Sequence, residues 1–555
     1  MARWILACVF IFTWSTASSW NTLSRPLDLR HDWLTAHTAI NLEYMRKCGP
    51  RALGASILFL PVHELDCKSP FRLEKPGKRI YLSYPTGWLL ALYPPYSLAR
   101  WMIPQSVPDY LVVRGLGLLL IRLPLIALIL WWMNALYRWA VPELKSDASF
   151  WLGFASATFL FSSPSFLHYT QNALFTDMFV LAPVYGSTVI LFNAWKKRKF
   201  SPASGTVLWL LLWLSAATDW YGAVWLGFVI CSIPFLFRDQ TRISLLVISI
   251  SAAAVAALHF VAQALILDPE LSQILATAGH RTGAGFDPME YLNSLKILIQ
   301  NTIFLFPVSP IIGRGLMPVV IFSLALAGSS LLLILQKKSR RGWLLLAPFY
   351  SGIIHLLLLS QHSAEHDFAV LKFGPVLVMV LPVLAGKWAS WMDDSSPGSK
   401  PRWSLSVVLL TCAVLFYFAA GGKELHLRTA GRPWINQDHL AMKEIGEHAL
   451  GPNEIPVTLE SKQEEGFIPL EARGWDPPIG LALAGREIYT QKRLMQYMPA
   501  MKPDAGTYKI VLLALSRRSG CPSQWESTNI HFQDSTVLIC RTGLTLDLYS
   551  RLAVE

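Results

Sequence analysis

Long apolar runs, separated by short polar segments, occupy most of this chain. The first run spans residues 3–20, and further runs follow at about 110–140, 149–167, 173–195, 204–218, 220–237, 243–266, 316–335, 343–360, 368–388 and 403–420. A helix of about 20 apolar residues crosses the hydrocarbon core of a bilayer. The pattern therefore predicts a polytopic α-helical membrane domain of about eleven spans over residues 1–420.

Two further apolar segments contain prolines, which disfavour an ordinary spanning helix. Residues 83–105 contain Pro85, Pro94 and Pro95, and residues 292–311 end in Pro307 and Pro310. We predict that the first segment is a helix lying at the outer surface. The second is predicted to be a similar interfacial or re-entrant piece.

Basic clusters between the runs set the orientation. They stand at residues 196–199, 238–242, 337–341 and 387–402. Short cytoplasmic loops are enriched in Lys and Arg, and a cytoplasmic N-terminus places every cluster on that side. The C-terminus then lies outside. Small residues at Ala17, Ser18 and Ser19 leave a cleaved signal peptide as the alternative to a retained first anchor.

The composition agrees with a membrane protein. Of 555 residues, 53% are hydrophobic and 15% are charged, whereas soluble domains carry about 25% charged residues. The net charge of +12 resides mainly in the short loops. We therefore expect no nucleic-acid partner.

The last part of the chain, residues 421–555, is more polar. Short apolar runs at 509–515 and 535–540 are typical of strands, so we predict a small extracytoplasmic α/β domain. Cys521 and Cys540 share this part, and Cys48 and Cys67 share the first external loop, residues 21–109. Both pairs are disulfide candidates in an oxidising compartment, and spacing alone leaves each pairing open.

Asp32 is the first candidate for chemistry, because it directly follows the first span. A carboxylate beside Trp33 at the membrane surface is poorly solvated, and such a group suits a general base. The alternative is an interfacial acid paired with Arg25 or Arg30.

The end of the same loop combines cations with tyrosines, just before a helix that a proline initiates. Cations and a helix N-terminus together favour an anion such as a lipid phosphate, although attraction to anionic headgroups is the alternative. The candidates are Lys75, Lys78, Arg79, Tyr81 and Tyr84.

Other polar residues are predicted at the external ends of separate spans. Each alone is typical of a satisfied group at a helix end, but Asp32, Asp177, Asp219 and His366 together are predicted at one depth on one face. An ionisable group inside the membrane boundary is a functional candidate. These substrate-binding candidates are His168, Tyr169, Asp177, Asp219, Arg281, His362 and His366.

Four short motifs resemble the GT-C glycosyltransferases, and more narrowly the protein O-mannosyltransferase and lipid A aminoarabinose transferase branch. They are an acid after the first span (Asp32), the stretch from Tyr84 to Gly87, the pair Tyr169 and Asp177, and the stretch from His366 to Pro375. The resemblance covers about residues 1–390.

The resemblance implies an inverting transferase for a polyprenyl-phosphate-linked sugar, acting on the periplasmic or lumenal side. Asp32 then serves as the base or orients the acceptor, which is a lipid, a glycan or a protein. Arg281, chosen by its side and loop, holds the donor phosphate. We expect a bacterial inner membrane, or the endoplasmic reticulum in a eukaryote.

Two departures from the family pattern concern metal use and phosphate binding. Many members have two adjacent acids where this chain has His31 and a lone Asp32, and Thr86 replaces a second proline. Lipid phosphate is already a good leaving group, so we expect no required cofactor, with a divalent metal as the weaker alternative. The rival functions are a transporter of lipid-linked saccharides and a non-catalytic subunit of an envelope glycan machine.

Overall fold

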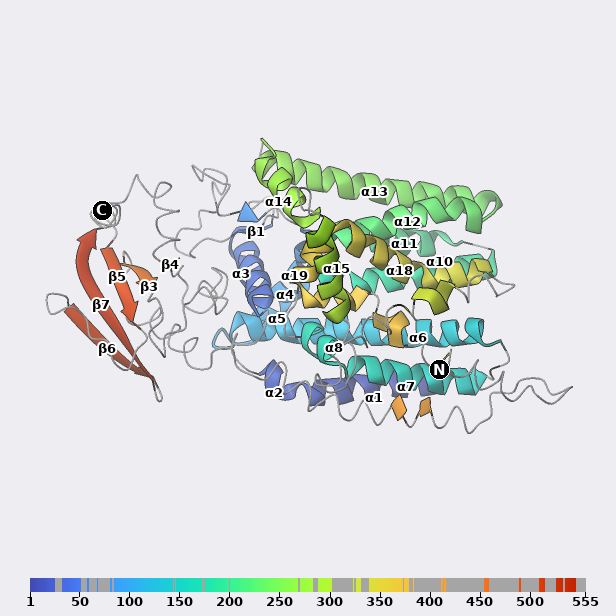
Figure 1. Cartoon of the computed structure of the whole chain (residues 1–555), viewed down its shortest axis with the longest axis horizontal. Coiled ribbons are helices and arrows are strands. Elements are labelled where there is room, and N and C mark those ends of the chain that lie inside the picture. Colours follow the sequence, from blue (N-terminus) through green and yellow to red (C-terminus); the bar gives the residue numbers. More distant parts are fainter. Residues whose placement is uncertain are drawn as a thin grey trace, which may run out of the picture.

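The protein is a helical bundle with a separate C-terminal sheet (Figure 1). In this computed structural model the described residues are 1–24, 32–50, 57–58, 67, 80–81, 84–142, 144, 146–171, 175–198, 200–267, 270–282, 288–301, 323, 326–330, 339–372, 374–378, 383, 411–412, 414–415, 454–458, 489–490, 509–514, 526–532 and 535–545. Figure 1 shows the long helices side by side, with α2 and α3 toward one end of the bundle and the N-terminus toward the other.

The longer bundle helices coincide with the predicted apolar runs. They are α1 (Ala2–Ser18), α5 (Asp109–Gly117), which continues through a π-helical turn, η3 (Leu118–Arg122), into α6 (Leu123–Ala140), then α7 (Ser146–Phe161), α10 (Leu181–Lys197), α11 (Pro202–Ala216), α12 (Trp220–Leu236), α13 (Asp239–Leu267) and α18 (Ser339–Leu358).

Shorter elements complete the bundle. They are α2 (Trp20–Leu23), α3 (Trp33–Cys48), β1 (Ile57–Leu58), β2 (Ile80–Tyr81), α4 (Gly87–Met102), α8 (Pro164–Tyr169), α9 (Thr176–Phe179), α14 (Ser272–Thr282), α15 (Pro288–Asn301), α19 (Ser360–Glu365) and the 3-10 helix η5 (Asp367–Lys372).

Two predicted spans differ from the structure at their ends. Ser163 caps α8 by accepting a hydrogen bond from the Phe166 amide, so the run 149–167 is two helices, α7 and α8. The run 368–388 opens with the buried 3-10 helix η5. Local caps and prolines break these runs, and apolar composition does not reveal such breaks. In contrast, α9 and α10 follow each other as one continuous helix, Thr176–Lys197.

Four helices among the described residues are long and apolar enough to cross a membrane: Asp109–Ala140, Thr176–Lys197, Gln240–Ile266 and Arg340–Leu358. Three shorter apolar helices, Ala2–Ser18, Pro202–Ala216 and Trp220–Leu236, accompany them. The runs 316–335 and 403–420 lie largely outside the described residues, so the number of eleven spans stays a prediction. The segment 83–105 contains α4, whose helix continues through Pro94 and Pro95.

Contacts between chain-distant residues place the basic ends of several helices together. Arg3 pairs with Asp147, so α1 and α7 begin at the same end of the bundle. The Arg341 guanidinium lies 5.4 Å from the centre of the Phe192 ring, near the basic end of α10. Trp343 donates to the Ser232 hydroxyl at 3.1 Å, near the end of α12. The described basic residues near these contacts lie at one end of the bundle. The cluster at residues 387–402 lies outside the described residues, so the orientation stays a prediction.

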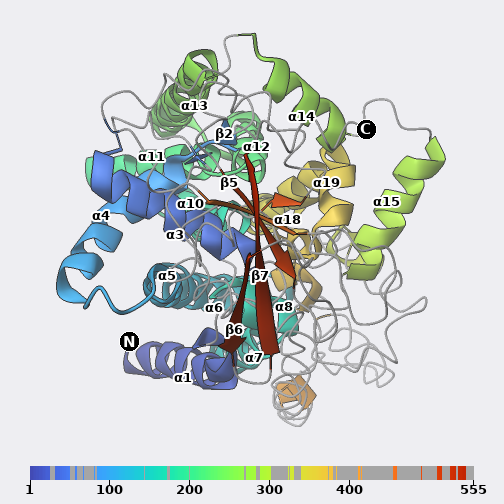
Figure 2. The ribbon, with the colours of Figure 1, turned by 90° about the vertical axis from the view of Figure 1, so that its left-hand side faces the viewer.

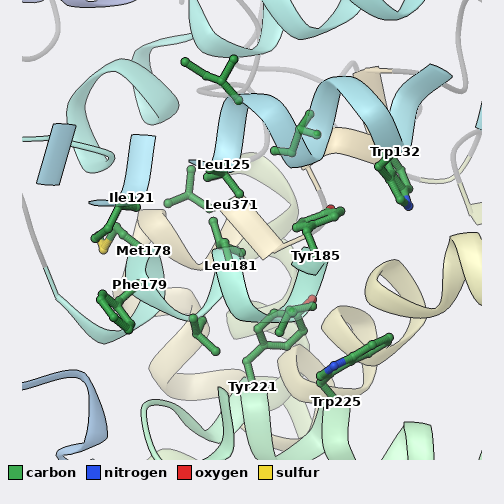
Figure 3. Packing of buried hydrophobic residues seen from close by; sticks show 14 of the residues in the cluster. Ile121, Leu125, Trp132, Met178, Phe179, Leu181, Tyr185, Tyr221, Trp225 and Leu371 are labelled. Atoms are coloured by element: carbon green, nitrogen blue, oxygen red, sulfur yellow. The ribbon is translucent and has the colours of Figure 1, made fainter. Parts of the chain in front are cut away.

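The bundle core contains large aromatic side chains, and several of them, such as Trp132 and Trp225, make hydrogen bonds with their polar atoms (Figure 3). The Trp132 indole donates to the Leu345 carbonyl at 2.7 Å, and the Trp225 indole donates to the Ser187 hydroxyl at 3.0 Å. Buried Tyr and Trp side chains are stable when these atoms find partners. The core therefore fixes the helices that carry the polar residues described below.

A five-stranded sheet forms the described part of residues 421–555, and Figure 2 shows it in front of the bundle. Its order is β4 (Tyr489–Thr490), β3 (Glu454–Thr458), β5 (Lys509–Ala514), β7 (Ser535–Thr545) and β6 (Glu526–Phe532). β3 pairs in parallel with β4 and β5, whereas β7 pairs antiparallel with β5 and β6. The helices of an α/β domain would fall outside the described residues, so that class stays a prediction.

One of the two candidate disulfides is present. Cys48 and Cys67 are bonded, with 4.9 Å between their Cα atoms, and this bond links the last residue of α3 to a residue 19 positions later. Cys521 lies outside the described residues, so its pairing with Cys540 stays open.

Candidate functional site

Two acids and a lysine form a buried charge cluster at one end of the bundle. The Lys372 ammonium lies 2.5 Å from Asp177 Oδ1 and 3.8 Å from Asp219 Oδ1. The three side chains are at most 1% exposed. Asp177 belongs to α9, Asp219 precedes α12 and Lys372 ends η5, so the cluster joins three segments that are distant in sequence. We call it the Lys372 cluster.

Asp219 makes further contacts that fix its position. It caps α12, because Oδ1 accepts a hydrogen bond from the Tyr221 amide at 2.8 Å. Oδ2 lies 3.0 Å from the Thr176 hydroxyl, and Nε2 of His355 lies 3.9 Å from Oδ1. A carboxylate at a helix N-terminus is a preferred cap. Both predicted acids, Asp177 and Asp219, are therefore enclosed by protein partners.

A second group contains Tyr84, His362, His366 and Arg281, which we call the Tyr84 group. A hydrogen bond of 2.8 Å joins the Tyr84 hydroxyl to His362 Nε2. The Arg281 guanidinium lies 4.1 Å from the centre of the Tyr84 ring, a cation–π arrangement. The rings of His362 and His366 are 4.5 Å apart. The structure thus brings together four residues that the sequence predicted separately.

Burial sets the protonation of His362. The burial of this ring, together with the nearby charges of His366, Arg281 and Lys372, holds the pKa of His362 well below its usual range. A neutral imidazole accepts a hydrogen bond at one ring nitrogen. A neutral His362 therefore shares a single proton with the Tyr84 hydroxyl across this hydrogen bond.

Asp32 forms a third group with Arg114, a residue of α5. Nη2 of Arg114 donates to Asp32 Oδ2 at 3.0 Å, and both side chains are fully buried. The sequence pointed to Arg25 or Arg30 as a partner, and both lie outside the described residues. A guanidinium fork orients a carboxylate well. Arg114 therefore fixes the position of the predicted base.

Phe175 connects these groups through ring contacts. Its ring centre lies 5.6 Å from that of His37 on α3, which begins after Asp32, and 5.4 Å from that of Tyr84. Beside it, the Gly87 amide donates to the Ala217 carbonyl at 2.6 Å. A Cβ on Gly87 would meet that oxygen at 2.6 Å, so only glycine allows this approach. The start of α4 is thereby held against the segment that leads to Asp219.

Arg122 is a fully buried cation in the π-helical turn. It donates to the Thr170 hydroxyl at 2.9 Å, to the Ser19 hydroxyl at 3.2 Å and to the Leu167 carbonyl at 2.6 Å. These bonds tie α6 to the end of α1 and to α8, the helix that contains His168 and Tyr169. The Tyr169 ring lies 5.5 Å from that of Phe368 on η5. These two predicted residues are thus buried packing neighbours of the site.

The remaining predicted site residues are only partly described. Lys75, Lys78 and Arg79 lie outside the described residues, and for Tyr81 the structure describes the backbone in β2. Sequence reasoning missed Lys372 and Arg114. Both stand inside apolar runs, where an ionisable residue is a functional candidate by default. Their position within those runs was therefore a sequence signal by which they could have been identified.

Comparisons with known proteins define the fold class. No protein-family model and no curated protein matches this chain. The structure is similar to apo ArnT from Cupriavidus metallidurans, with a TM-score of 0.53 and 12% identity over 97% of this chain and 98% of that chain. It is also similar to the apo oligosaccharyltransferase of Archaeoglobus fulgidus, with a TM-score of 0.51 and 14% identity over 92% and 69%.

Both of these proteins are GT-C glycosyltransferases. The present chain is therefore a membrane protein with the fold of these GT-C proteins, which confirms at the level of fold the resemblance that its motifs indicate.

Proposed function

We propose that this chain is a membrane glycosyltransferase that transfers a sugar from a polyprenyl-phosphate-linked donor to an acceptor on the extracytoplasmic side. The observation that carries the proposal is the fold shared with ArnT over nearly the full length of both chains. ArnT has also been solved with undecaprenyl phosphate, and the Archaeoglobus enzyme with dolichol-phosphate and an inhibitory peptide. Fold alone does not define chemistry, so the site residues supply the rest.

The proposed reaction is a single inverting displacement. The acceptor hydroxyl oxygen forms a bond to the anomeric carbon while the bond from that carbon to the phosphate oxygen breaks. Asp32 takes the hydroxyl proton, and the bonding electrons leave with the polyprenyl phosphate. Arg114 keeps Asp32 oriented, and Arg281 holds the phosphate as its charge grows.

Donor turnover by the purified protein tests this function. The protein, in detergent or nanodiscs, is incubated with a panel of polyprenyl-phosphate sugars, and free polyprenyl phosphate is measured. Release of the lipid phosphate from at least one donor is expected. Tight binding of a donor without turnover, by a folded protein, would favour the transporter or the non-catalytic subunit instead.

Arg281→Gln is expected to raise the KM for the donor. A hydrogen bond to a charged group is worth about 1.5–3 kcal/mol, which corresponds to about 10- to 150-fold. The matched control is Arg340→Gln, because Arg340 is exposed at the basic start of α18. An unchanged KM in Arg281→Gln, or an equal rise in the control, would remove Arg281 from the donor site.

We further propose that no divalent metal is required. The lipid phosphate is a good leaving group, and the guanidinium of Arg281 supplies positive charge for it. Turnover is therefore expected to be unchanged by excess EDTA. A loss that added Mg²⁺ or Mn²⁺ restores would contradict this proposal.

A further inference from the structure

The Lys372 cluster contains an excess of acids. If Asp177, Asp219 and Lys372 are all ionised and His355, 3.9 Å from Asp219, is neutral, these buried side chains carry a net charge of −1. An uncompensated charge inside a protein is costly, and a buried acid commonly avoids that cost by taking up a proton. Protonation of one of the two carboxyls would remove this excess negative charge.

The Thr176 hydroxyl lies between the two carboxyls, and its distances to them bear on which one is protonated. Its oxygen lies 3.0 Å from Asp219 Oδ2 and 3.4 Å from Asp177 Oδ2. A hydroxyl has one proton to donate, so it satisfies one ionised carboxylate. It bonds to both acids only if the other carboxyl donates a proton to it. The arrangement thus fits one ionised acid and one protonated acid on either side of Thr176.

The distances to Lys372 identify the protonated acid. The ammonium lies 2.5 Å from Asp177 Oδ1 but 3.8 Å from Asp219 Oδ1, so Asp177 is the ionised partner. Asp219 lies in the turn between α11 and α12. Burial and the Asp177 charge raise the pKa of Asp219, against the opposing effects of Lys372, the Tyr221 amide and the Thr176 hydroxyl. If Asp219 is protonated, its carboxyl supplies the proton of the contact with Thr176, and the Thr176 hydroxyl donates to Asp177.

Each member of the cluster stands close in sequence to a contact of the Tyr84 group. Lys372 ends η5, which follows His366 directly. Asp177 stands two residues after Phe175, whose ring packs on Tyr84. Asp219 stands two residues after Ala217, which accepts the hydrogen bond from Gly87 at the start of α4. A shift within the cluster therefore moves the segments that surround Tyr84.

We propose that Lys372 and Asp177 form a positioning ion pair for the Tyr84 group, and that Asp219 contributes to it as a protonated, uncharged acid. These residues act through the segments that they hold and do not touch the donor. The kinetic part of this inference rests on the proposed transferase function. The structural part does not.

The test compares two isosteric variants, Asp177→Asn and Asp219→Asn. In Asp219→Asn the new amide oxygen retains the cap of α12, and the amide nitrogen donates to Thr176 as the carboxyl proton did. In Asp177→Asn the new amide offers Lys372 no charge, so Asp219 must ionise and Lys372 moves toward it, displacing η5. Small displacements of positioned groups cost on the order of a hundredfold. We expect a donor KM raised by about that factor in Asp177→Asn and unchanged kinetics in Asp219→Asn.

The pattern of kinetic changes separates positioning from loss of fold. A partly unfolded preparation lowers the apparent kcat and leaves KM unchanged, whereas a displaced donor site raises KM. Equal losses of activity in the two variants, or a loss in Asp219→Asn alone, would overturn the assignment of the proton. Unchanged kinetics in both variants would overturn the positioning role.

Hydrogen exchange supplies a measurement that needs no activity. Peptides covering residues 84–92 and 360–372 are expected to exchange faster in Asp177→Asn than in the wild type, and at the wild-type rate in Asp219→Asn. If the wild type turns over no donor, the proposed function fails, and this comparison still decides the inference. Equal exchange of these peptides in the two variants would contradict it.

Discussion

Asp32→Asn is expected to lower donor turnover by about 10²- to 10⁴-fold, the usual contribution of a positioned acid or base. An amide keeps the shape of the carboxylate but cannot take the proton of the acceptor hydroxyl. Donor binding should be retained, because the proposed phosphate contact is made by Arg281 on another helix. The measurement is release of polyprenyl phosphate under single-turnover conditions, together with binding of the intact donor.

The buried partner of Asp32 complicates this variant, and a second variant resolves the difficulty. Asp32→Asn leaves the Arg114 guanidinium buried without its carboxylate, which by itself destabilises a protein. The double variant Asp32→Asn with Arg114→Gln removes both charges. It should regain stability and stay inactive.

The control for both variants is Asp147→Asn. Asp147 lies with Arg3 at the opposite end of the bundle and is largely exposed. This control should keep full turnover. Substantial turnover by a folded Asp32→Asn protein would show that another group accepts the proton.

Lys372→Met should lower the free energy of unfolding by about 3–5 kcal/mol, as when one partner of a buried ion pair is removed. Methionine fills a similar volume, but the ionised Asp177 carboxylate then has no counter-ion in a closed site. The measurement is unfolding of the purified protein in detergent, by heat or by titration with a denaturing detergent.

A charge-matched double variant isolates the electrostatic cause. Lys372→Met combined with Asp177→Asn removes the pair as a unit, and such replacements are often close to neutral, so most of the stability should return. Lys196→Met is the control, because Lys196 is exposed at the end of α10. Surface substitutions change stability by at most about 0.5 kcal/mol. If the double variant is no more stable than Lys372→Met, packing rather than charge explains the loss.

The sequence alone predicted the fold class, which the structure confirms, and the end of the bundle at which the chemistry is expected. Runs of apolar residues predict membrane helices because a helix needs about 20 apolar residues to cross the bilayer. Basic clusters predict the cytoplasmic end because Lys and Arg are enriched in the short loops on that side. Asp177, Asp219 and His366 were assigned to the other end by this reasoning. Short motifs were enough to indicate the GT-C fold, which the similarity to ArnT and to the Archaeoglobus oligosaccharyltransferase confirms.

Tertiary structure alone decided which of these residues act together. Asp32 and Arg114 are separated by 82 positions, and Lys372 is farther still from its partner Asp177. No local pattern encodes such a pairing, because periodicity describes one element at a time. Whether a charge inside an apolar run faces lipid, a cavity or a counter-ion depends on helices from elsewhere in the chain. Only the packing of these helices brings Lys372 to Asp177, a predicted substrate-binding acid that the structure encloses in a buried cluster. The same packing places the Arg281 guanidinium over the Tyr84 ring.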